Sequence, residues 1–258
     1  MGTALVTGAT SGLGEEFCWQ LASAGHDLVL VARRERLLDE LADRLRNVAG
    51  VRAQVLVADL ADPTDLQRVC DRLDADSGTD GTGPVGLLVN NAGYGLGVPF
   101  PDDDLERELR ALDVMVRAVM VLAHHAARSM RRRGRGAILN VASVASLTGA
   151  GTYSAHKAWV VAFTEGLSEE LRGTGVTASC VCPGPTRTAF FDNAGVDMSR
   201  TPHWAMASPE RVVGEALDAV RSRRVLVTPT PVHKAAMGAM RLSPRWVVRR
   251  VMRAIPHM

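Results

Sequence analysis

The chain has 258 residues, of which 47% are hydrophobic and 22% are charged, and its formal net charge is +2. This composition supports a sizeable core and excludes a disordered chain, a collagen-like fibre and a disulfide scaffold, while so small a net charge gives no indication of a nucleic-acid partner. The four cysteines (Cys18, Cys70, Cys180 and Cys182) lie in apolar stretches without the spacing of a zinc site or a CxxC pair. We therefore expect reduced core cysteines, no metal site and a cytoplasmic setting. The stretch of residues 136–156, which has no Lys, Arg, Asp or Glu, is too polar to cross a bilayer.

Short runs rich in Val and Leu alternate along the chain with longer segments of helical spacing, a pattern typical of βα units around a parallel sheet. The near-continuous apolar character of these runs indicates strands that are buried on both faces. The predicted strands are Thr3–Thr7, Asp27–Ala32, Arg52–Ala58, Val85–Asn90, Gly136–Ala142, Val176–Cys182 and Val225–Val227. The sequence therefore predicts one α/β domain over residues 1–258, with a Rossmann-like, doubly wound parallel sheet of about seven strands and helices on both faces.

A glycine-rich turn lies directly between the first predicted strand and the helical run Glu15–Ala24. It reads Thr7-Gly8-Ala9-Thr10-Ser11-Gly12-Leu13-Gly14. Glycines let the backbone approach a pyrophosphate there, and free N–H groups at the helix N-terminus stabilise the negative charge. The turn predicts a dinucleotide site, the alternative being a tight turn that binds no ligand.

The end of the second predicted strand indicates which dinucleotide binds. A site specific for NAD usually carries an acidic residue about 20 residues after the turn, where it accepts the ribose hydroxyls. Here the strand ends at Ala32 and is followed by Arg33 and Arg34, two guanidinium groups suited to a 2′-phosphate. The sequence therefore predicts NADP(H), the alternative being two arginines that only solvate the start of a helix.

The spacing Gly8-x-x-x-Gly12-x-Gly14 resembles the TGxxxGxG motif of the short-chain dehydrogenases/reductases. Four further motifs of that family follow in order, and the resemblance covers essentially the whole chain. These motifs are Asp59-Leu60, Asn90-Asn91-Ala92-Gly93, Tyr153-Ser154-Ala155-His156-Lys157, and Pro183-Gly184 followed by Thr188. By this resemblance, Asp59 contacts the adenine, residues 90–93 support the sheet and the cofactor ribose, and Thr188 binds the carboxamide.

The expected cofactor-binding residues come from these motifs and from the strand end. They are Gly8, Thr10, Ser11, Gly12, Leu13, Gly14, Arg33, Arg34, Asp59, Leu60, Asn91, Ala92, Gly93, Tyr153, Lys157, Pro183, Gly184 and Thr188.

Three residues are the expected catalytic group. Tyr153 and Lys157 are four residues apart in a helical segment, so their side chains share one face. A neighbouring ammonium favours the phenolate, so we expect it to lower the pKa of the tyrosine, which then serves as acid and base. Ser143 ends a predicted strand, and the resemblance makes it the donor to the substrate oxygen. The cofactor would carry the hydride.

Two departures from the family pattern bear on this group. Ser143 and Tyr153 are ten residues apart, three fewer than usual, and the residue at the usual distance is Asn140 inside the strand. We interpret this as a deletion in the loop Ser146–Thr152, with Ser146 as the second candidate for the serine. In addition, Met115 occupies the position of a family asparagine that helps to hold a proton-relay water near the lysine. A thioether accepts hydrogen bonds only weakly and donates none, so the relay is rearranged, weakened or absent.

Two segments are expected to shape the surroundings of the site. The loop of about 185–208 follows a strand's carboxyl end and is the predicted substrate loop, with Phe100, Phe190, Phe191, Trp204 and Met206 as candidate walls of an apolar pocket. From residue 219 onward there are nine Lys or Arg and no Asp or Glu. This basic segment, about 230–255, has helical spacing broken near Pro244, and its apolar side fits the body of the fold, a second subunit or an anionic membrane surface.

The sequence thus predicts an NADP(H)-dependent oxidoreductase that interconverts a carbonyl and an alcohol on a small, apolar substrate, in a homodimer or homotetramer. The alternative is a relative that binds NADP(H) without turnover and acts as a sensor or interaction protein, which Met115 and the shortened loop would explain.

Overall fold

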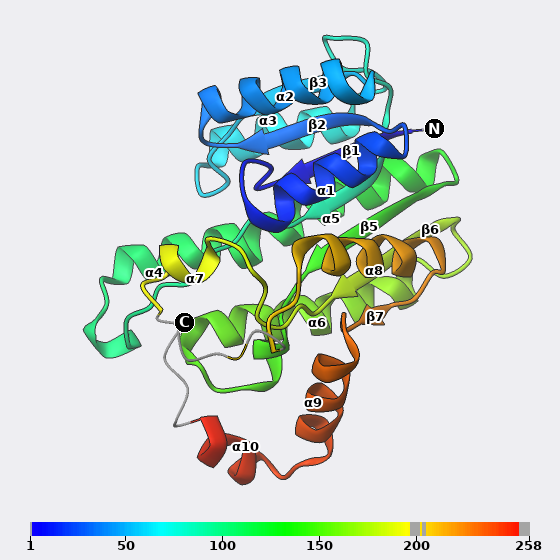
Figure 1. The fold of residues 1–258 in the computed structure, drawn as a ribbon. Helices are drawn as coiled ribbons and strands as arrows, with labels where there is room; N and C mark the ends of the chain where they lie inside the picture. The colour runs from blue at the N-terminus through cyan, green and yellow to red at the C-terminus, as the bar shows by residue number, and fades with distance from the viewer. Residues whose placement is uncertain (1, 197–201, 203–204, 253–258) are drawn as a thin grey trace.

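The computed structural model describes residues 2–196, 202 and 205–252, and it contains a seven-stranded, entirely parallel sheet (Figure 1). The strands are β1 (Thr3–Thr7), β2 (Asp27–Ala32), β3 (Ala53–Val57), β4 (Val85–Asn90), β5 (Gly136–Val141), β6 (Val176–Val181) and β7 (Leu226–Val227). Every predicted strand is present, and no boundary differs from the prediction by more than one residue. The doubly wound fold is confirmed.

The strand order, β3-β2-β1-β4-β5-β6-β7, decides where a ligand can enter. The chain winds from β1 outward to β3 and then returns to place β4 on the other side of β1. Thr3 to Thr7 therefore pair with β2 on one side and with β4 on the other. Connections leave β1 and β4 in opposite directions, and such a reversal opens a crevice at the carboxyl ends of these strands.

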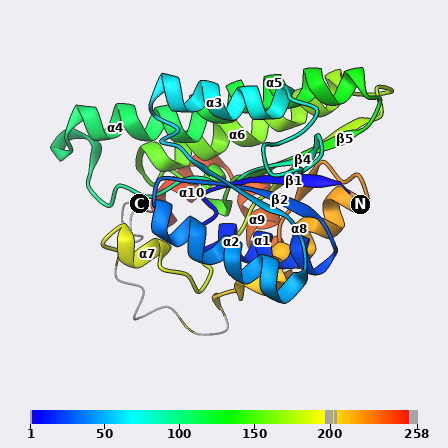
Figure 2. The ribbon, with the colours of Figure 1, turned by 90° about the horizontal axis from the view of Figure 1, so that it is seen from above.

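Two layers of helices cover the sheet, as Figure 2 shows. One face packs against α3 (Pro63–Asp74), α4 (Leu105–Leu112), α5 (Ala118–Arg132) and α6 (Gly151–Glu170), and the other against α1 (Gly12–Ser23), α2 (Glu35–Ala49) and α8 (Pro209–Arg221). Alternate residues of β1 serve the two cores: Leu5 lies in the first and Val6 in the second, both with no exposed surface. The apolar character of the strands follows from this burial on both faces.

Four shorter elements connect the longer ones. They are the 3-10 turns η1 (Phe100–Asp102) and η3 (Val144–Leu147), the π-helical turn η2 (Asp113–Arg117) that joins α4 to α5, and α7 (Phe190–Asn193). All four cysteines are free and buried, as predicted. Burial raises the pKa of the thiols of Cys18 and Cys70, the latter to about 11.

The basic C-terminal segment forms two helices, α9 (Pro231–Leu242) and α10 (Arg245–Met252), separated at Ser243 and Pro244 as the sequence predicts. The first helix begins at Pro231, and Thr230 caps it by accepting a hydrogen bond from the His233 amide at 3.4 Å. Residues 253–255 of the predicted segment lie outside the described residues. Among the described helices, none is long and apolar enough to span a membrane.

Candidate active site

The glycine-rich turn lies at the carboxyl end of β1 and is tied to the end of β4. Thr7 Oγ1 accepts hydrogen bonds from the amides of Asn91 at 3.0 Å and Ala92 at 3.1 Å, and Asn91 Nδ2 donates to Thr7 O at 2.9 Å. Gly8 has φ +68°, which favours glycine, and a Cβ on Gly14 would lie 2.0 Å from Gly8 O. The glycines thus bring the start of α1 directly against the strand end.

The N-terminus of α1 is open to an anion. Its cap residue, Ser11, makes no hydrogen bond from its side chain to the first helical amides, which leaves these donors available for a phosphate. The second guanidinium predicted to bind a 2′-phosphate lies beside the same turn, because Arg34 Nη2 donates to Thr10 O at 3.1 Å and to Thr10 Oγ1 at 3.0 Å. Arg33 and Arg34 are both exposed. These residues fit a dinucleotide that carries an additional phosphate.

Asp59 and Leu60 follow β3 at the same edge of the sheet. Asp59 accepts from the Ala61 amide at 3.1 Å and forms an ion pair with Arg110 of α4, which fixes its carboxylate. The Leu60 side chain is buried in the hydrophobic core, so only its backbone can face a ligand.

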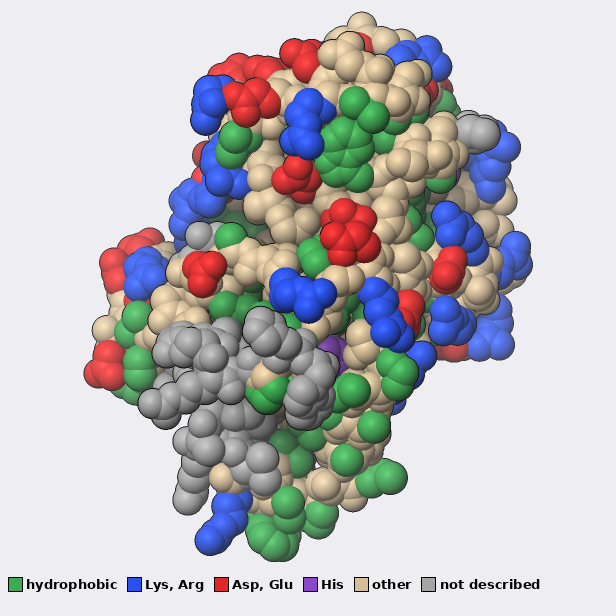
Figure 3. All heavy atoms as spheres, viewed as in Figure 1, with side chains coloured by type: hydrophobic (Ala, Val, Ile, Leu, Met, Phe, Trp, Pro, Cys, Tyr) green, Lys and Arg blue, Asp and Glu red, His purple; other side chains and the backbone are tan. Residues whose placement is uncertain are grey.

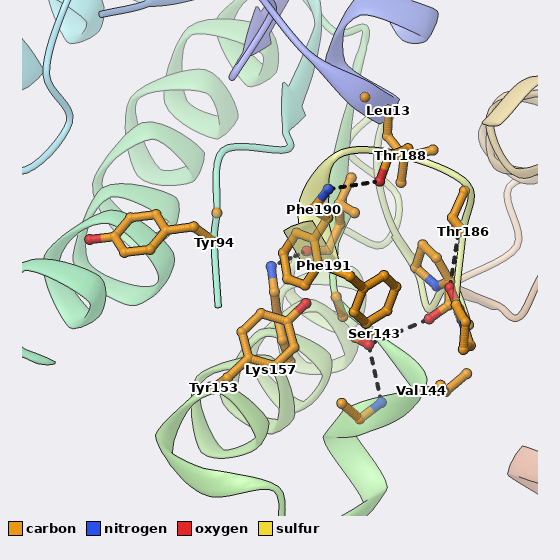
Figure 4. A pocket seen from close by; sticks show the side chains of 18 of the residues that line it. Leu13, Tyr94, Ser143, Val144, Tyr153, Lys157, Thr186, Thr188, Phe190 and Phe191 are labelled. Carbon is orange, nitrogen blue, oxygen red and sulfur yellow. Dashed lines mark hydrogen bonds between the residues drawn. The ribbon is translucent and has the colours of Figure 1, made fainter. Parts of the chain in front are cut away.

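A cavity of about 590 Å³ extends from the glycine-rich turn to α9 (Figure 4). The predicted residues that line it are Gly8, Ser11, Gly12, Leu13, Asn91, Ala92, Gly93, Ser143, Tyr153, Lys157, Pro183, Gly184 and Thr188. Thr10, Gly14, Arg33, Arg34, Asp59 and Leu60 lie outside its lining. Of the candidate wall residues, Phe190 and Phe191 line the cavity, whereas Phe100 and Met206 do not, and Trp204 lies outside the described residues.

The cavity brings together the three predicted catalytic side chains, Tyr153, Lys157 and Ser143 (Figure 4). Tyr153 and Lys157 project from the first turns of α6 and keep only 6% and 4% of their surface exposed. Lys157 Nζ donates to Val141 O at 2.8 Å and lies 5.7 Å from the centre of the Tyr153 ring.

Ser143 follows β5 and caps η3, with its hydroxyl oxygen accepting from the Ala145 amide at 3.1 Å. The hydroxyl donates to Pro183 O at 3.4 Å, a long contact that a closer acceptor can replace. Ser146, the second candidate, is buried; its hydroxyl has no hydrogen-bond partner among the described residues and does not line the cavity. Of the two candidates, Ser143 is therefore the serine that lines the cavity together with Tyr153.

Burial shifts the pKa values of both Tyr153 and Lys157. It raises the pKa of Tyr153 above the ordinary value of 10.0, and a hydrogen bond with Ser143 acts in the opposite direction without reversing the shift. Burial also lowers the pKa of Lys157 from 10.5 to about 8. The expected lowering of the tyrosine pKa is therefore wrong for this structure, because loss of solvent around the phenolate outweighs the hydrogen bond with Ser143. Tyr153 holds its proton throughout the neutral range.

Met115 lies beside the lysine, in the π-helical turn η2. A Cβ added to Gly93 would lie 3.3 Å from both Met115 Sδ and Lys157 Nζ, so the thioether and the ammonium border the same small gap. Met115 is fully buried. The position predicted to correspond to the family asparagine is thus filled by an apolar side chain.

Sequence reasoning missed two polar contributions. His233 of α9 lines the cavity, accepts from or donates to Thr230 Oγ1 at 2.9 Å, and its Nε2 lies 3.0 Å from Ala205 O. A Cβ on Gly184 would lie 2.4 Å from the His233 ring, so this glycine makes room for the imidazole. No local sequence signal joins positions so far apart.

The second missed contribution supports the sheet beneath the site. Asn90 Nδ2 donates to Asn140 Oδ1, and Asn140 Nδ2 donates to Thr164 Oγ1, each at 2.9 Å. All three side chains are buried, so Asn140 links the ends of β4 and β5 to α6.

Comparison with known proteins gives the family of this fold and site. A family model described as short chain dehydrogenase matches residues 2–198. The chain belongs to the short-chain dehydrogenase/reductase family. Sulfoacetaldehyde reductase 2 of Chromohalobacter salexigens, a relative of this short-chain dehydrogenase/reductase, is 37% identical over 191 residues, which cover 72% of this chain and 73% of the relative.

Two solved structures share the fold closely. A short-chain dehydrogenase from Sphingobium yanoikuyae in complex with NADPH has a TM-score of 0.83 and 33% identity, covering 95% of this chain and 97% of that one. A short-chain dehydrogenase/reductase from Burkholderia phymatum in complex with NAD has a TM-score of 0.80 and 27% identity, covering 93% and 92%. This short-chain dehydrogenase/reductase is thus a member of an oxidoreductase family whose structures hold either nicotinamide cofactor.

Proposed function

We propose that this protein is an NADPH-dependent reductase that converts a carbonyl into an alcohol. The observation that carries the proposal is the meeting of Tyr153, Lys157 and Ser143 in a cavity that continues to the open N-terminus of α1. The bound cofactor supplies the hydride.

The protein's own groups orient the carbonyl and deliver the proton. Ser143 turns its hydroxyl from Pro183 O to the substrate oxygen, where charge develops during the reaction. Tyr153 donates its Oη proton to the same oxygen. Lys157, fixed by Val141 O, supplies the positive charge that stabilises the resulting phenolate.

Reduction is the direction that the protonation of the site favours. The raised pKa of Tyr153 keeps its proton in place at neutral pH, where Lys157 is charged because its pKa is about 8. A proton donor is therefore ready for reduction, whereas oxidation would need a phenolate that burial disfavours.

Consumption of NADPH against a panel of aldehydes, ketones and quinones tests this reaction. We expect oxidation of NADPH by the wild-type protein and its loss in Tyr153→Phe, with NADPH binding retained. Activity that survives Tyr153→Phe would contradict the mechanism.

The cofactor preference is a separate part of the proposal. The two positions directly after β2 hold the exposed Arg33 and Arg34 and no acidic residue, which supports NADP(H). Because a hydrogen bond to a charged group contributes about 1.5–3 kcal/mol, we expect NADPH to bind at least about tenfold more tightly than NADH. Fluorescence titration of both cofactors measures this ratio.

Substitutions of single arginines identify which guanidinium groups cause the preference for NADPH over NADH. Arg33→Ala and Arg34→Ala should each reduce the preference, whereas Arg36→Ala serves as the matched control, because Arg36 pairs with Glu40 on the exposed side of α2. Equal affinities for NADPH and NADH in the wild type would refute the preference.

A protein that binds NADP(H) without turnover is the second candidate, and Met115 is the observation that favours it. The thioether of Met115 borders the same gap as Lys157 and accepts hydrogen bonds only weakly, so it is poorly suited to hold a relay water there. Binding of NADPH without oxidation by any compound in the panel, together with activity gained by Met115→Asn, would favour this candidate over the reductase.

The substrate class proposed is an apolar ketone, such as a steroid, a fatty acyl or an aromatic ketone. Phe190, Phe191 and Val196 of the loop after β6 line the cavity together with Val144 and Met240. These walls support the assignment of the loop 185–208 to substrate binding, as far as residue 196. A preference for short, charged aldehydes in the same panel would contradict it.

An apolar stripe on α4 and α5 supports a homo-oligomer. Leu105, Leu109, Leu112 and Met120 are exposed by 60%, 44%, 41% and 46%. A stripe of this length is usually covered by a second subunit. Sedimentation velocity of the wild type and of Leu109→Lys tests the assembly, which should dissociate in the variant. The buried, free cysteines support the cytoplasmic setting included in the proposal.

A further inference from the structure

The imidazole of His233 joins three segments that are far apart in the sequence. His233 lies on α9 and is buried, and the absence of a side chain at Gly184, directly after β6, makes room for its ring. Its Nδ1 lies 2.9 Å from Thr230 Oγ1, at the start of the helix. Its Nε2 lies 3.0 Å from Ala205 O, on the returning end of the loop that follows β6. The ring therefore links α9 to both ends of this loop.

The partners of the two ring nitrogens determine the tautomer. A carbonyl oxygen can only accept, so Nε2 carries the hydrogen and donates to Ala205 O. Nδ1 of the neutral ring is then an acceptor, and the Thr230 hydroxyl donates to it while its oxygen accepts from the His233 amide at 3.4 Å. Each ring nitrogen has one partner, which fixes the orientation of the imidazole.

The residue that orients the ring has a strained backbone. Thr230 has φ +66°, an unfavourable value for a β-branched residue and one that is rare before a proline, here Pro231. Its amide donates to Glu215 Oε1 of α8 at 3.3 Å. Strain of this kind persists where the surrounding structure imposes it, and it is concentrated at functional sites. The position of the Thr230 hydroxyl is thus held at a cost in backbone conformation.

The rest of α9 contacts the fold mainly through apolar side chains. Met237 is buried, and Ala236 and Met240 line the cavity. Figure 3 shows hydrophobic side chains gathered at the lower end of the molecule, where Figure 1 places α9. Apolar contacts are non-directional, so the hydrogen bond from His233 is what sets the position of Ala205 relative to the helix.

The position of Ala205 is passed on to the other arm of the loop, because the two arms are paired. The Ala207 amide donates to Pro185 O at 2.8 Å, and the Arg187 amide donates to Ala207 O at 3.0 Å. Thr186 and Ala207 form a parallel bridge. A shift of the returning arm at Ala205 would therefore move the outgoing arm, Pro185–Thr188.

The outgoing arm reaches across the cavity to the glycine-rich turn. Thr186 and Thr188 both line the cavity, and Figure 4 shows Thr188 beside Leu13 of that turn. A Cβ on Gly12 would lie 3.3 Å from the Thr188 side chain, so the two residues border the same space. A dinucleotide bound at the N-terminus of α1 therefore contacts this arm.

We propose that His233 is a positioning residue for the cofactor: by donating to Ala205 O, it holds the arm Pro185–Thr188 against the dinucleotide. It acts through Ala205 and Ala207 rather than by touching the reacting atoms. The inference rests on the proposed binding of NADPH, which both candidate functions share, and not on turnover.

Fluorescence titration with NADPH tests the role of the hydrogen bond. His233→Leu should weaken binding about fivefold, the effect of one neutral hydrogen bond. His233→Gln should bind as the wild type does, because its amide can place an N–H donor where Nε2 lies. His26→Leu is the matched control, since His26 Nδ1 also lies 3.1 Å from a backbone carbonyl, that of Gly2, but outside the lining of the cavity. It should not change the affinity.

A double-variant comparison tests whether Thr230 acts through the ring. Thr230→Val keeps the β-branch, removes the hydroxyl and should also weaken NADPH binding, by up to about fivefold. Thr230→Val/His233→Leu should bind about as weakly as His233→Leu alone, because both substitutions break one linked pair of bonds. Independent contributions would instead multiply to about 25-fold. Thermal unfolding well above the temperature of the titration shows that each variant is folded.

Nitrogen NMR spectra of the histidines test the contact without any cofactor. At about pH 8, where an ordinary histidine is neutral, the resonances of His233 should show hydrogen on Nε2 and none on Nδ1. The opposite tautomer would overturn the proposal, whatever the protein binds. So would NADPH binding that is unchanged in His233→Leu, binding that is as weak in His233→Gln as in His233→Leu, or independent effects of the two positions. A wild type with the expected tautomer that does not bind NADPH would contradict the proposed function, and with it the role of His233 in holding the cofactor.

Discussion

Loss of the Lys157 proton should limit the rate of reduction at high pH. When Tyr153 gives up its proton, the phenolate is stabilised by an ammonium 5.7 Å from the ring centre. At an effective dielectric constant of about 20 this attraction is about 3 kcal/mol, or about 100-fold in rate. Because burial lowers the pKa of Lys157 to about 8, the attraction is present below pH 8 and is lost as the pH rises above it. Tyr153, whose pKa is raised, keeps its proton over the same range.

The substitution Met115→Asn should raise the pH above which the rate of reduction falls. The amide oxygen of asparagine can accept a hydrogen bond from the ammonium across the gap beside Gly93, where the thioether of Met115 cannot do so effectively. A hydrogen bond to a charged group contributes about 1.5–3 kcal/mol, and about 1.4 kcal/mol shifts a pKa by one unit. The alkaline limit of the reduction should therefore rise by about one to two pH units.

The assay measures kcat/KM for the reduction of a ketone by NADPH from pH 6 to 10, because this ratio reports ionisations of the free enzyme. Met115→Leu is the control, since it preserves an apolar side chain and should leave the limit near pH 8. An alkaline limit that stays in place in Met115→Asn, or that moves equally in Met115→Leu, would refute this account of the lysine.

Three further predictions concern the frame around the site. Gly14→Ala places a Cβ 2.0 Å from Gly8 O, so NADPH binding should weaken at least about tenfold in a fluorescence titration; unchanged binding would contradict the close contact. Gly184→Ala collides with the His233 ring and should lower the melting temperature, and adding His233→Ala should recover part of the loss in calorimetry rather than add to it. Asp62→Ala removes a cap that accepts from two amides of α3, which should cost about 1 kcal/mol and about 2–4 °C in thermal unfolding; no change would mean that water replaces the cap.

The strands could be predicted from the sequence because both faces of the sheet are covered. Leu28 and Val29 point to opposite sides, yet neither has any exposed surface, so the whole strand reads as apolar. The glycine-rich turn could also be predicted from the sequence, since the backbone at Gly8 has a positive φ and the close contact at Gly14 leaves no room for a side chain. These requirements are local, and local requirements appear in a short stretch of sequence.

Contacts between distant segments could not be predicted in this way. Nothing near Gly184 indicates that the ring of His233 packs on it, and nothing near Asn140 indicates a bond to Thr164 on α6. Phe100 was a candidate wall residue for its apolar character alone, but it lies in η1 and is 56% exposed. The direction of the pKa shift of Tyr153 also depends on burial, which cannot be inferred from the spacing of Tyr153 and Lys157.

The burial of all four cysteines has a practical consequence for biophysical work on this protein. Thiol reagents attack the thiolate, and Cys18 and Cys70 are buried with a raised pKa while Cys180 and Cys182 have no exposed surface. A cysteine introduced at an exposed position, such as Ser222→Cys after α8, is then the thiol that maleimide reaches first. A fluorophore or spin label can be attached there without removing any native cysteine, on a scaffold whose core stays unchanged.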